Sequence, residues 1–222
     1  MGKFRYLFTF CLAFVVSGCS HNMALTKGQT NIVLSTNSIA LLSVKIFNQN
    51  KPGRQLDLAG FIICPQSKTC TDGAVNLYKA DDLYKSEKDL FNEYLLSFEL
   101  ESGTYNIKSI IAVYSVPLLV SAGGGASLDL KAEIKPKSVI YLGHIDAILR
   151  ERKNDNEERA GLFPLIDSAI AGFSSGTFDV VVEDRFEEDM KGFNSEYPAL
   201  QSVQIEKSIL PQWIRPENRG TK

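Results

Sequence analysis

Polar and apolar residues alternate strictly in the segment Ser127-Leu128-Asp129-Leu130-Lys131-Ala132-Glu133-Ile134. Every even-numbered position is apolar, and every odd-numbered position is a serine or a charged residue. Successive side chains of a β-strand point to opposite faces of the sheet, so this pattern predicts a strand with one buried face. We therefore expect this strand to cover one side of a hydrophobic core.

The same period of two recurs elsewhere in the chain. One face of segment 39–47 and one face of segment 94–100 consist of large apolar residues at alternate positions. Further strands are expected at 58–64, 105–114, 138–148 and 177–183. Seven strands separated by turn residues predict a mainly β protein with the architecture of an antiparallel β-sandwich.

A tight turn is expected between two of these strands, at Glu101–Thr104, where Gly103 can adopt a positive φ. The segment Leu100-Glu101-Ser102-Gly103-Thr104-Tyr105 resembles the L-x-x-G-x-Y phrase of immunoglobulin-like and transthyretin-like sandwiches of exported proteins. The resemblance spans six residues, and it implies an architecture but no activity.

One short helix is expected near the C-terminus, at about 184–192. Asp184 and Glu187 have the spacing of a capping box, and Gly192 can end the helix. An apolar stripe with the spacing i, i+4 and i+7 is expected to pack against the sandwich. Its members are Phe186, Met190 and Phe193. Residues after 213 are expected to fray.

The N-terminus has the layout of a secretory signal peptide. Lys3 and Arg5 precede an apolar run of 11 residues at 6–16, and the small residues Ser17 and Gly18 follow. A helix that spans a bilayer needs about 20 apolar residues, so a cleaved signal is favoured over a permanent membrane span.

The end of this run, Val16-Ser17-Gly18-Cys19, resembles the lipobox of bacterial lipoproteins, in which the cysteine is invariant. The resemblance covers residues 1–20. It implies that the Cys19 thiol receives a diacylglyceryl group, that a dedicated peptidase cuts before Cys19, and that the new amino group is acylated. Two or three acyl chains hold a protein firmly in a membrane. The alternative is an ordinary signal peptide followed by an unrelated cysteine.

Ser20, and not Asp, follows the cysteine. In Gram-negative lipoproteins this implies sorting to the outer membrane, facing the periplasm. The implied partners are the membrane, through acyl chains on Cys19, and the machinery that processes and sorts lipoproteins. Residues 1–18 would then be the signal peptide, 19–30 a lipidated tether, and 31–222 the sandwich domain. A fully extended tether could reach roughly 35–40 Å.

Composition narrows the classes of function. The chain has 222 residues, 44% of them hydrophobic and 23% charged, and a net charge of −2, which indicates a folded domain with no nucleic-acid partner. Cleavage before Cys19 leaves 204 residues with 22 basic and 26 acidic side chains, and thus a net charge of −4. Electrostatics alone should not hold this acidic body on anionic headgroups.

The four cysteines fall into three groups. Cys11 is removed with the signal and Cys19 is lipidated, which leaves Cys64 and Cys70. Two remaining cysteines in an exported protein favour a disulfide, and closing so short a loop contributes about 2–2.5 kcal/mol. The alternative is a metal clip, but no histidine or further cysteine lies nearby in the sequence.

No catalytic residue, cofactor or metal site is expected. The segment Gly172-Phe173-Ser174-Ser175-Gly176 satisfies the G-x-S-x-G pattern of hydrolases, but no histidine follows it, as that mechanism requires. We interpret it as a Gly/Ser-rich turn. His144 lies in an expected strand and has no second histidine in the sandwich domain with which to share a metal.

Four other segments are expected to lie outside the core. Residues 123–125 (Gly-Gly-Gly) suggest a flexible turn, and the charged run 150–159 suggests the solvated tip of a long hairpin. The apolar stretches 116–120 and 162–166 each contain a proline, which places them at edges or in loops. They would either form a contact patch for another envelope protein or cover the ends of the sandwich.

Taken together, these features favour a lipid-anchored bacterial envelope protein with a non-catalytic binding or assembly role, for which another envelope protein is a candidate partner. One alternative is an exported hydrolase that uses acidic residues whose pairing the sequence does not reveal. Another is a structural accessory subunit of an envelope complex.

Overall fold

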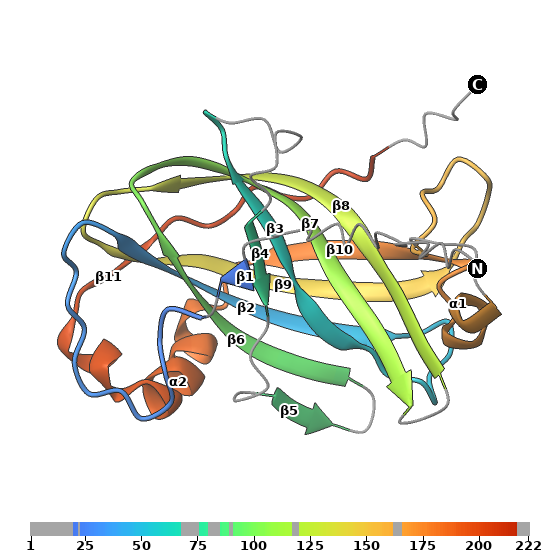
Figure 1. Ribbon diagram of the computed structural model, residues 1–222, viewed down its shortest axis with the longest axis horizontal. Helices are drawn as coiled ribbons and strands as arrows, with labels where there is room; N and C mark the ends of the chain where they lie inside the picture. Colours follow the sequence, from blue (N-terminus) through green and yellow to red (C-terminus); the bar gives the residue numbers. More distant parts are fainter. Residues whose placement is uncertain are drawn as a thin grey trace, which may run out of the picture.

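Two β-sheets pack face to face in the computed structural model (Figure 1). The structure describes residues 20–21, 23–67, 76–79, 85–88, 91–116, 120–161 and 166–216. Within these ranges strands predominate and helices are short, so the prediction of a mainly β sandwich is confirmed.

The first sheet has the strand order β1-β4-β3-β7-β8. Its strands are β1 (Ser20–His21), β4 (Asn76–Lys79), β3 (Asp57–Pro65), β7 (Gly103–Val116) and β8 (Val120–Ile134). Neighbouring strands run antiparallel except β1 and β4, which are parallel.

The second sheet has the order β10-β9-β2-β6-β5. Its strands are β10 (Gly176–Glu183), β9 (Val139–Glu151), β2 (Ser38–Asn48), β6 (Phe91–Leu100) and β5 (Lys85–Lys88), and the short β11 (Ile205–Lys207) joins the start of β9. Strands β2 and β9 are parallel, so the expectation of a purely antiparallel sandwich is wrong here. These strands are far apart in the chain, and the long intervening segment allows them to run in the same direction.

The core lies between the two sheets and follows the alternation seen in the sequence. In β8 the even-numbered residues from Leu128 to Ile134 are buried, while Asp129, Lys131 and Glu133 are exposed. Phe61 of β3 and Phe98 of β6 meet edge to face across the core, with ring centroids 6.1 Å apart. Burying one face of each strand therefore holds the sheets together.

The three glycines at 123–125 lie inside β8 and do not form the turn expected from the sequence. A Cβ on Gly124 would lie 2.3 Å from the Phe173 ring, and one on Gly125 would lie 2.2 Å from the Ile110 carbonyl oxygen. The amide of Gly125 also donates to the carbonyl of Ala160 at 2.8 Å. Glycine is present at these positions because neighbouring chain segments approach closely.

Helix α2 (Phe186–Glu196) lies on the outer face of the second sheet, and α1 (Ile166–Ala171) lies at the other end of the sandwich (Figure 1). Met190 and Phe193 of α2 are buried, as the apolar stripe predicted. The helix does not end at Gly192, however, because Phe193 packs into a second apolar cluster with Tyr197. The short 3₁₀ helix Pro198–Ser202 follows.

The helix start also differs from the prediction. Asp184 Oδ1 accepts a hydrogen bond from the Phe186 amide at 3.2 Å, whereas Arg185 occupies the N-cap position without a side-chain cap. The predicted capping box with Glu187 is therefore not formed.

The first residues after β1 cover the edge of β6. The amides of Ala24 and Leu25 donate to the carbonyl and the hydroxyl of Ser97, at 2.8 and 2.9 Å. Met23 and Leu25 are buried. The predicted tether at 19–30 is thus wrong from residue 23 onward, because this apolar triplet gains more by covering the sandwich than by remaining in water.

The C-terminal segment covers the opposite flank, between β8 and β10. The Trp213 indole donates to the Ser127 carbonyl at 2.9 Å, and Arg215 donates to the Phe178 carbonyl at 2.9 Å. Arg215 also pairs with Asp179. The expected fraying after residue 213 is therefore wrong for residues up to 216.

The close approach at Gly125 gives a stability prediction. Gly125→Ala places a methyl group against the Ile110 carbonyl and should lower the free energy of unfolding by about 1–3 kcal/mol. Gly123→Ala is the matched control, because its Cβ would meet the nearest atom at 4.0 Å, and it should change stability by less than about 1 kcal/mol. Urea denaturation of both variants measures the difference. Equal effects would contradict the packing explanation.

Candidate functional site

A cluster of buried polar side chains lies between the second sheet and α2. It contains Ser43 on β2, Tyr141 and His144 on β9, and Asp189 on α2. Ser43, Tyr141 and His144 have an exposed fraction of 0%, and Asp189 is 6% exposed. Polar groups buried to this extent need hydrogen-bond partners from within the protein.

The Asp189 carboxylate collects hydrogen bonds from both strands. Tyr141 donates its phenolic hydrogen to Asp189 Oδ2 at 2.6 Å, and the Ser43 hydroxyl donates to the same oxygen. Ser43 Oγ lies 2.8 Å from His144 Nδ1. The single hydroxyl hydrogen of Ser43 goes to Asp189, so Ser43 accepts its second hydrogen bond from Nδ1–H of His144.

The other ring nitrogen of His144 faces two groups of opposite charge. Nε2 lies 3.0 Å from Arg185 Nη1 and 3.4 Å from Asp146 Oδ1. In the neutral ring Nε2 accepts from Arg185, and in the protonated ring it donates to Asp146. Both protonation states therefore have a hydrogen-bond partner on this side.

Charged residues from five elements lie around His144 and Arg185. Arg185 Nη2 lies 2.7 Å from Glu188 on α2 and 3.8 Å from Glu93 on β6. Lys45 of β2 lies 3.8 Å from Asp146 of β9. Glu183 of β10 is the register partner of His144. The network thus ties α2 to β2, β6 and β9.

These contacts change the pKa values of the cluster. Burial lowers the pKa of His144, but the hydrogen bond to Asp146 and the nearby Asp189 carboxylate, whose Oδ2 lies 3.7 Å from Nδ1, outweigh this effect, so the pKa is raised. Burial raises the pKa of Asp189, but the nearby His144 ring, whose Nδ1 lies 3.7 Å from Oδ2, and the hydrogen bonds from Ser43 and Tyr141 outweigh it, so this pKa is lowered. The pKa of Tyr141 is raised, first by burial and then by its bond to Asp189.

The cluster contains a serine, a histidine and carboxylates, but its geometry is that of a structural lock, by which we mean a buried hydrogen-bond network that holds α2 on the second sheet. In a catalytic triad the histidine accepts the serine proton, whereas here the Ser43 proton goes to Asp189. Ser43 and His144 are also closed to solvent, so a substrate carbonyl cannot reach the hydroxyl. The arrangement fixes α2 on the sheet, which is a positioning role.

The sequence interpretation missed Asp189, although a signal was available. Phe186, Asp189, Met190 and Phe193 have the spacing i, i+3, i+4 and i+7, so Asp189 belongs to the same helix face as the apolar stripe. A charged residue on a buried face requires a partner from the surface that it contacts. That partner set, Ser43, Tyr141 and His144, comes from two strands that the sequence does not pair.

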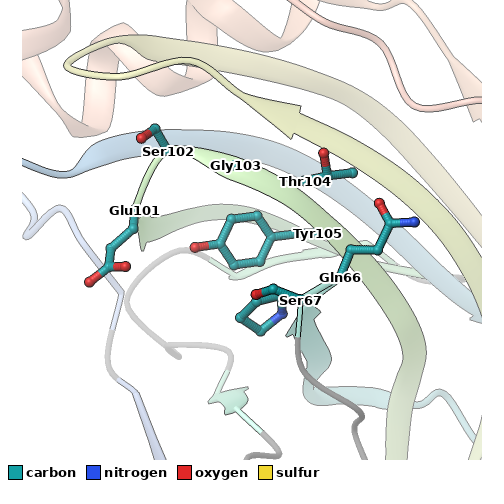
Figure 2. A pocket seen from close by; sticks show the side chains of 8 residues that line it. Gln66, Ser67, Glu101, Ser102, Gly103, Thr104 and Tyr105 are labelled. Atoms are coloured by element: carbon teal, nitrogen blue, oxygen red, sulfur yellow. The ribbon is translucent and has the colours of Figure 1, made fainter.

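An open pocket of about 540 Å³ lies at the end of β3, beside the turn that joins β6 and β7 (Figure 2). Its lining residues are Pro65, Gln66, Ser67, Glu101, Ser102, Gly103, Thr104 and Tyr105. Burial and the nearby Glu101 charge raise the pKa of Tyr105. Gly103 has φ +148°, so the expected positive φ in this turn is confirmed. The pocket offers hydrogen-bonding groups and one carboxylate, a set suited to binding.

The predicted site residues are only partly within the described ranges. Cys19 and Cys70 lie outside them, so lipidation of Cys19 and the pairing of Cys70 stay predictions. Cys64 is buried and disulfide-bonded. Residues 172–175 form a turn, as expected for the G-x-S-x-G segment.

The charged run at 150–159 is less solvated than expected. Arg150 donates to both carboxylate oxygens of Glu157, at 2.6 and 2.9 Å, and its Nε donates to Asp179 at 2.6 Å. Glu157 is 8% exposed, and hydrogen bonding from Arg150 lowers its pKa to about 2. The hairpin-tip prediction is wrong for these two residues, because the loop after β9 folds back on β10.

The apolar stretches predicted at 116–120 and 162–166 fall mainly on residues 117–119 and 162–165, outside the described ranges.

A comparison of the chain with known family models, curated proteins and solved structures found no match. Within the described ranges, no group of three or more His, Cys, Asp or Glu residues could hold a metal ion. None of the helices described there is long and apolar enough to cross a bilayer. Function is therefore inferred from the residues themselves.

The buried carboxylate gives a second stability prediction. Asp189→Ala leaves Ser43 and Tyr141 without their shared acceptor and removes the charge beside His144, and it should lower the free energy of unfolding by about 3–5 kcal/mol. Glu187→Ala is the matched control, because Glu187 is an exposed acid in the same helical turn, and it should cost less than about 0.5 kcal/mol. Urea denaturation reports both values, and a cost below 1 kcal/mol for Asp189→Ala would contradict the lock.

The raised pKa of His144 predicts a pH dependence. A histidine whose pKa is higher in the folded than in the unfolded state contributes stability that is complete below the unfolded value of 6.5 and is lost as the pH rises through the folded value. The free energy of unfolding should therefore fall as the pH rises above about 6.5. His144→Gln should remove this decrease. Identical pH dependence in both proteins, measured by denaturation at each pH, would disprove the assignment.

Proposed function

We propose that this chain is a lipid-anchored protein of the bacterial envelope, and that its sandwich acts by binding or assembly and not by catalysis. The observation that carries the proposal is Val16-Ser17-Gly18-Cys19, placed directly after a basic region and an apolar run of 11 residues. A thiol at this position is what lipoprotein maturation requires. The acyl chains on Cys19 would then attach the protein to the membrane.

The disulfide at Cys64 supports an exported location. Disulfides persist in oxidising compartments such as the periplasm and are rare in the cytosol. Cys64 is buried at the end of β3, where the bond would restrain the loop that follows.

The buried network supports a non-catalytic role. The chain has two histidines, and one of them, His144, is enclosed between β9 and α2 with its ring nitrogens engaged. His21 lies in β1, two residues from the predicted lipidation site. His144 is not placed as a general base beside the serine of the G-x-S-x-G turn, since it bonds Ser43.

The binding role draws support from the pocket at the end of β3. It is open to solvent and lined mainly by uncharged polar groups around Tyr105, as Figure 2 shows. Surfaces of this kind, with an aromatic ring beside hydrogen-bonding groups, suit a peptide segment of another protein. An envelope protein is therefore the partner class that we favour.

Lipidation is tested directly in cells. Cys19→Ala should abolish labelling of the protein by an alkyne analogue of palmitate and release it from the membrane fraction, because the acylated thiol is gone. Cys11→Ala is the matched control and should leave labelling unchanged, since Cys11 lies in the removed signal. Persistent labelling of the Cys19→Ala protein would contradict the proposal that Cys19 is lipidated.

The same strains test the assembly role. Cross-linking in the intact envelope followed by mass spectrometry should recover a specific protein partner with the native chain, and recovery should drop at least several-fold with Cys19→Ala. Equal recovery with both chains would show that the anchor does not serve assembly.

A further inference from the structure

The chain between the lipidation site and the packed body is very short. Ser20 and His21 form β1, which pairs with Leu77 and Tyr78 of β4 at the edge of the first sheet. Met23 is buried, with only 9% of its surface exposed, and its sulfur accepts a hydrogen bond from the Ser97 amide at 3.4 Å. Cys19 therefore directly precedes a residue that is part of the sheet.

The residues that follow cannot lengthen this connection. The Ala24 and Leu25 amides are fixed on Ser97, as described above. Lys27 Nζ lies 2.9 Å from a Glu196 carboxylate oxygen, and the Gly28 amide donates to the Glu196 carbonyl at 2.9 Å. Extending the spacer beyond Met23 would break each of these contacts and expose Leu25.

The length of the spacer and the size of the folded domain then determine how close the domain lies to the membrane. Four Cα–Cα steps separate Cys19 from Met23, which gives a maximum reach of about 14 Å. A folded body of 204 residues has a radius of gyration of roughly 17 Å, and hence a radius of roughly 21 Å. The headgroup layer itself is about 5–7 Å thick. After the headgroup layer is crossed, at most about 7–9 Å remains between the lipid surface and Met23, well below the radius of the body, and the pairing of Ser20 with Leu77 shortens this distance further.

We propose that the flank formed by β1 and the segment 23–26 rests directly on the lipid surface, with the sandwich lying side-on to the membrane. This proposal rests on lipidation of Cys19. Strand β8 is at the opposite edge of the first sheet, so the flank closed by Trp213 and Arg215 faces away from the lipid. A protein partner would therefore approach the sandwich from its faces or from this distal flank.

The acyl chains on Cys19, and not the charge of the domain, bring this flank into contact with the lipid surface. After cleavage the chain carries a net charge of −4, so an anionic bilayer should not attract it. The acyl chains supply the affinity and the short spacer supplies the orientation.

Photo-cross-linking to lipid tests this orientation in the full lipidated chain. Benzoylphenylalanine replaces either Thr26, an exposed residue on the proximal flank, or Ile214, which is 84% exposed on the distal flank. The proteins are reconstituted in vesicles of phosphatidylethanolamine and phosphatidylglycerol that carry an alkyne-tagged phospholipid. Lipid adducts at Thr26 should exceed those at Ile214 at least five-fold.

A lengthened spacer provides the control. Twenty Gly/Ser residues inserted after Ser20 add a mean reach of about 25 Å. Lipid adducts at Thr26 should then fall toward the level at Ile214, while palmitate labelling is retained.

The outcomes separate the two proposals. Palmitate labelling with equal adducts at Thr26 and Ile214, or with Thr26 adducts that the insertion leaves unchanged, would overturn the side-on orientation and leave lipidation standing. Absence of palmitate labelling would overturn both.

Discussion

The buried carboxylate of Asp189 is the contact that positions much of the outer layer. Its hydrogen bonds from Ser43 and Tyr141 fix α2 on the second sheet. The last turn of α2 in turn receives the N-terminal segment, because the Glu196 carbonyl accepts from the Gly28 amide. One ionised group in a low-dielectric setting thereby links two strands, a helix and the segment nearest the predicted membrane anchor.

The two ends of the described chain close the two open flanks of the sandwich. Residues 23–25 cover the edge of β6, and residues 213–216 bridge β8 and β10. Unpaired strand edges invite association with other chains, so covering them favours a discrete domain. The N-terminal closure also shortens the spacer after the predicted lipid site at Cys19, so this packing bears on the proposed orientation at the membrane.

The long strands could be predicted because the alternation of apolar and polar residues within each one shows which face is buried, whereas the short strands β1, β4, β5 and β11 were not predicted. The alternation around Leu130 is confirmed in β8, and the helix stripe through Met190 and Phe193 is confirmed in α2. The sequence predictions were wrong or incomplete where a residue type can serve two different structural roles. Gly124 was interpreted as flexible, but it serves close packing against Phe173, and Asp189 was not recognised as a buried acceptor.

The sequence by itself determined the period-two strands and the scarcity of histidine, and it carries the pattern on which the predicted export signal and the predicted lipid site at Cys19 rest. These properties depend on neighbouring residues or on composition. The tertiary structure alone decided that β2 and β9 lie parallel, that Ser43, His144 and Asp189 meet, and that the predicted tether packs from Met23 onward. Each of these depends on contacts between residues far apart in the chain, whose pairing is set by how the whole sandwich closes around its core.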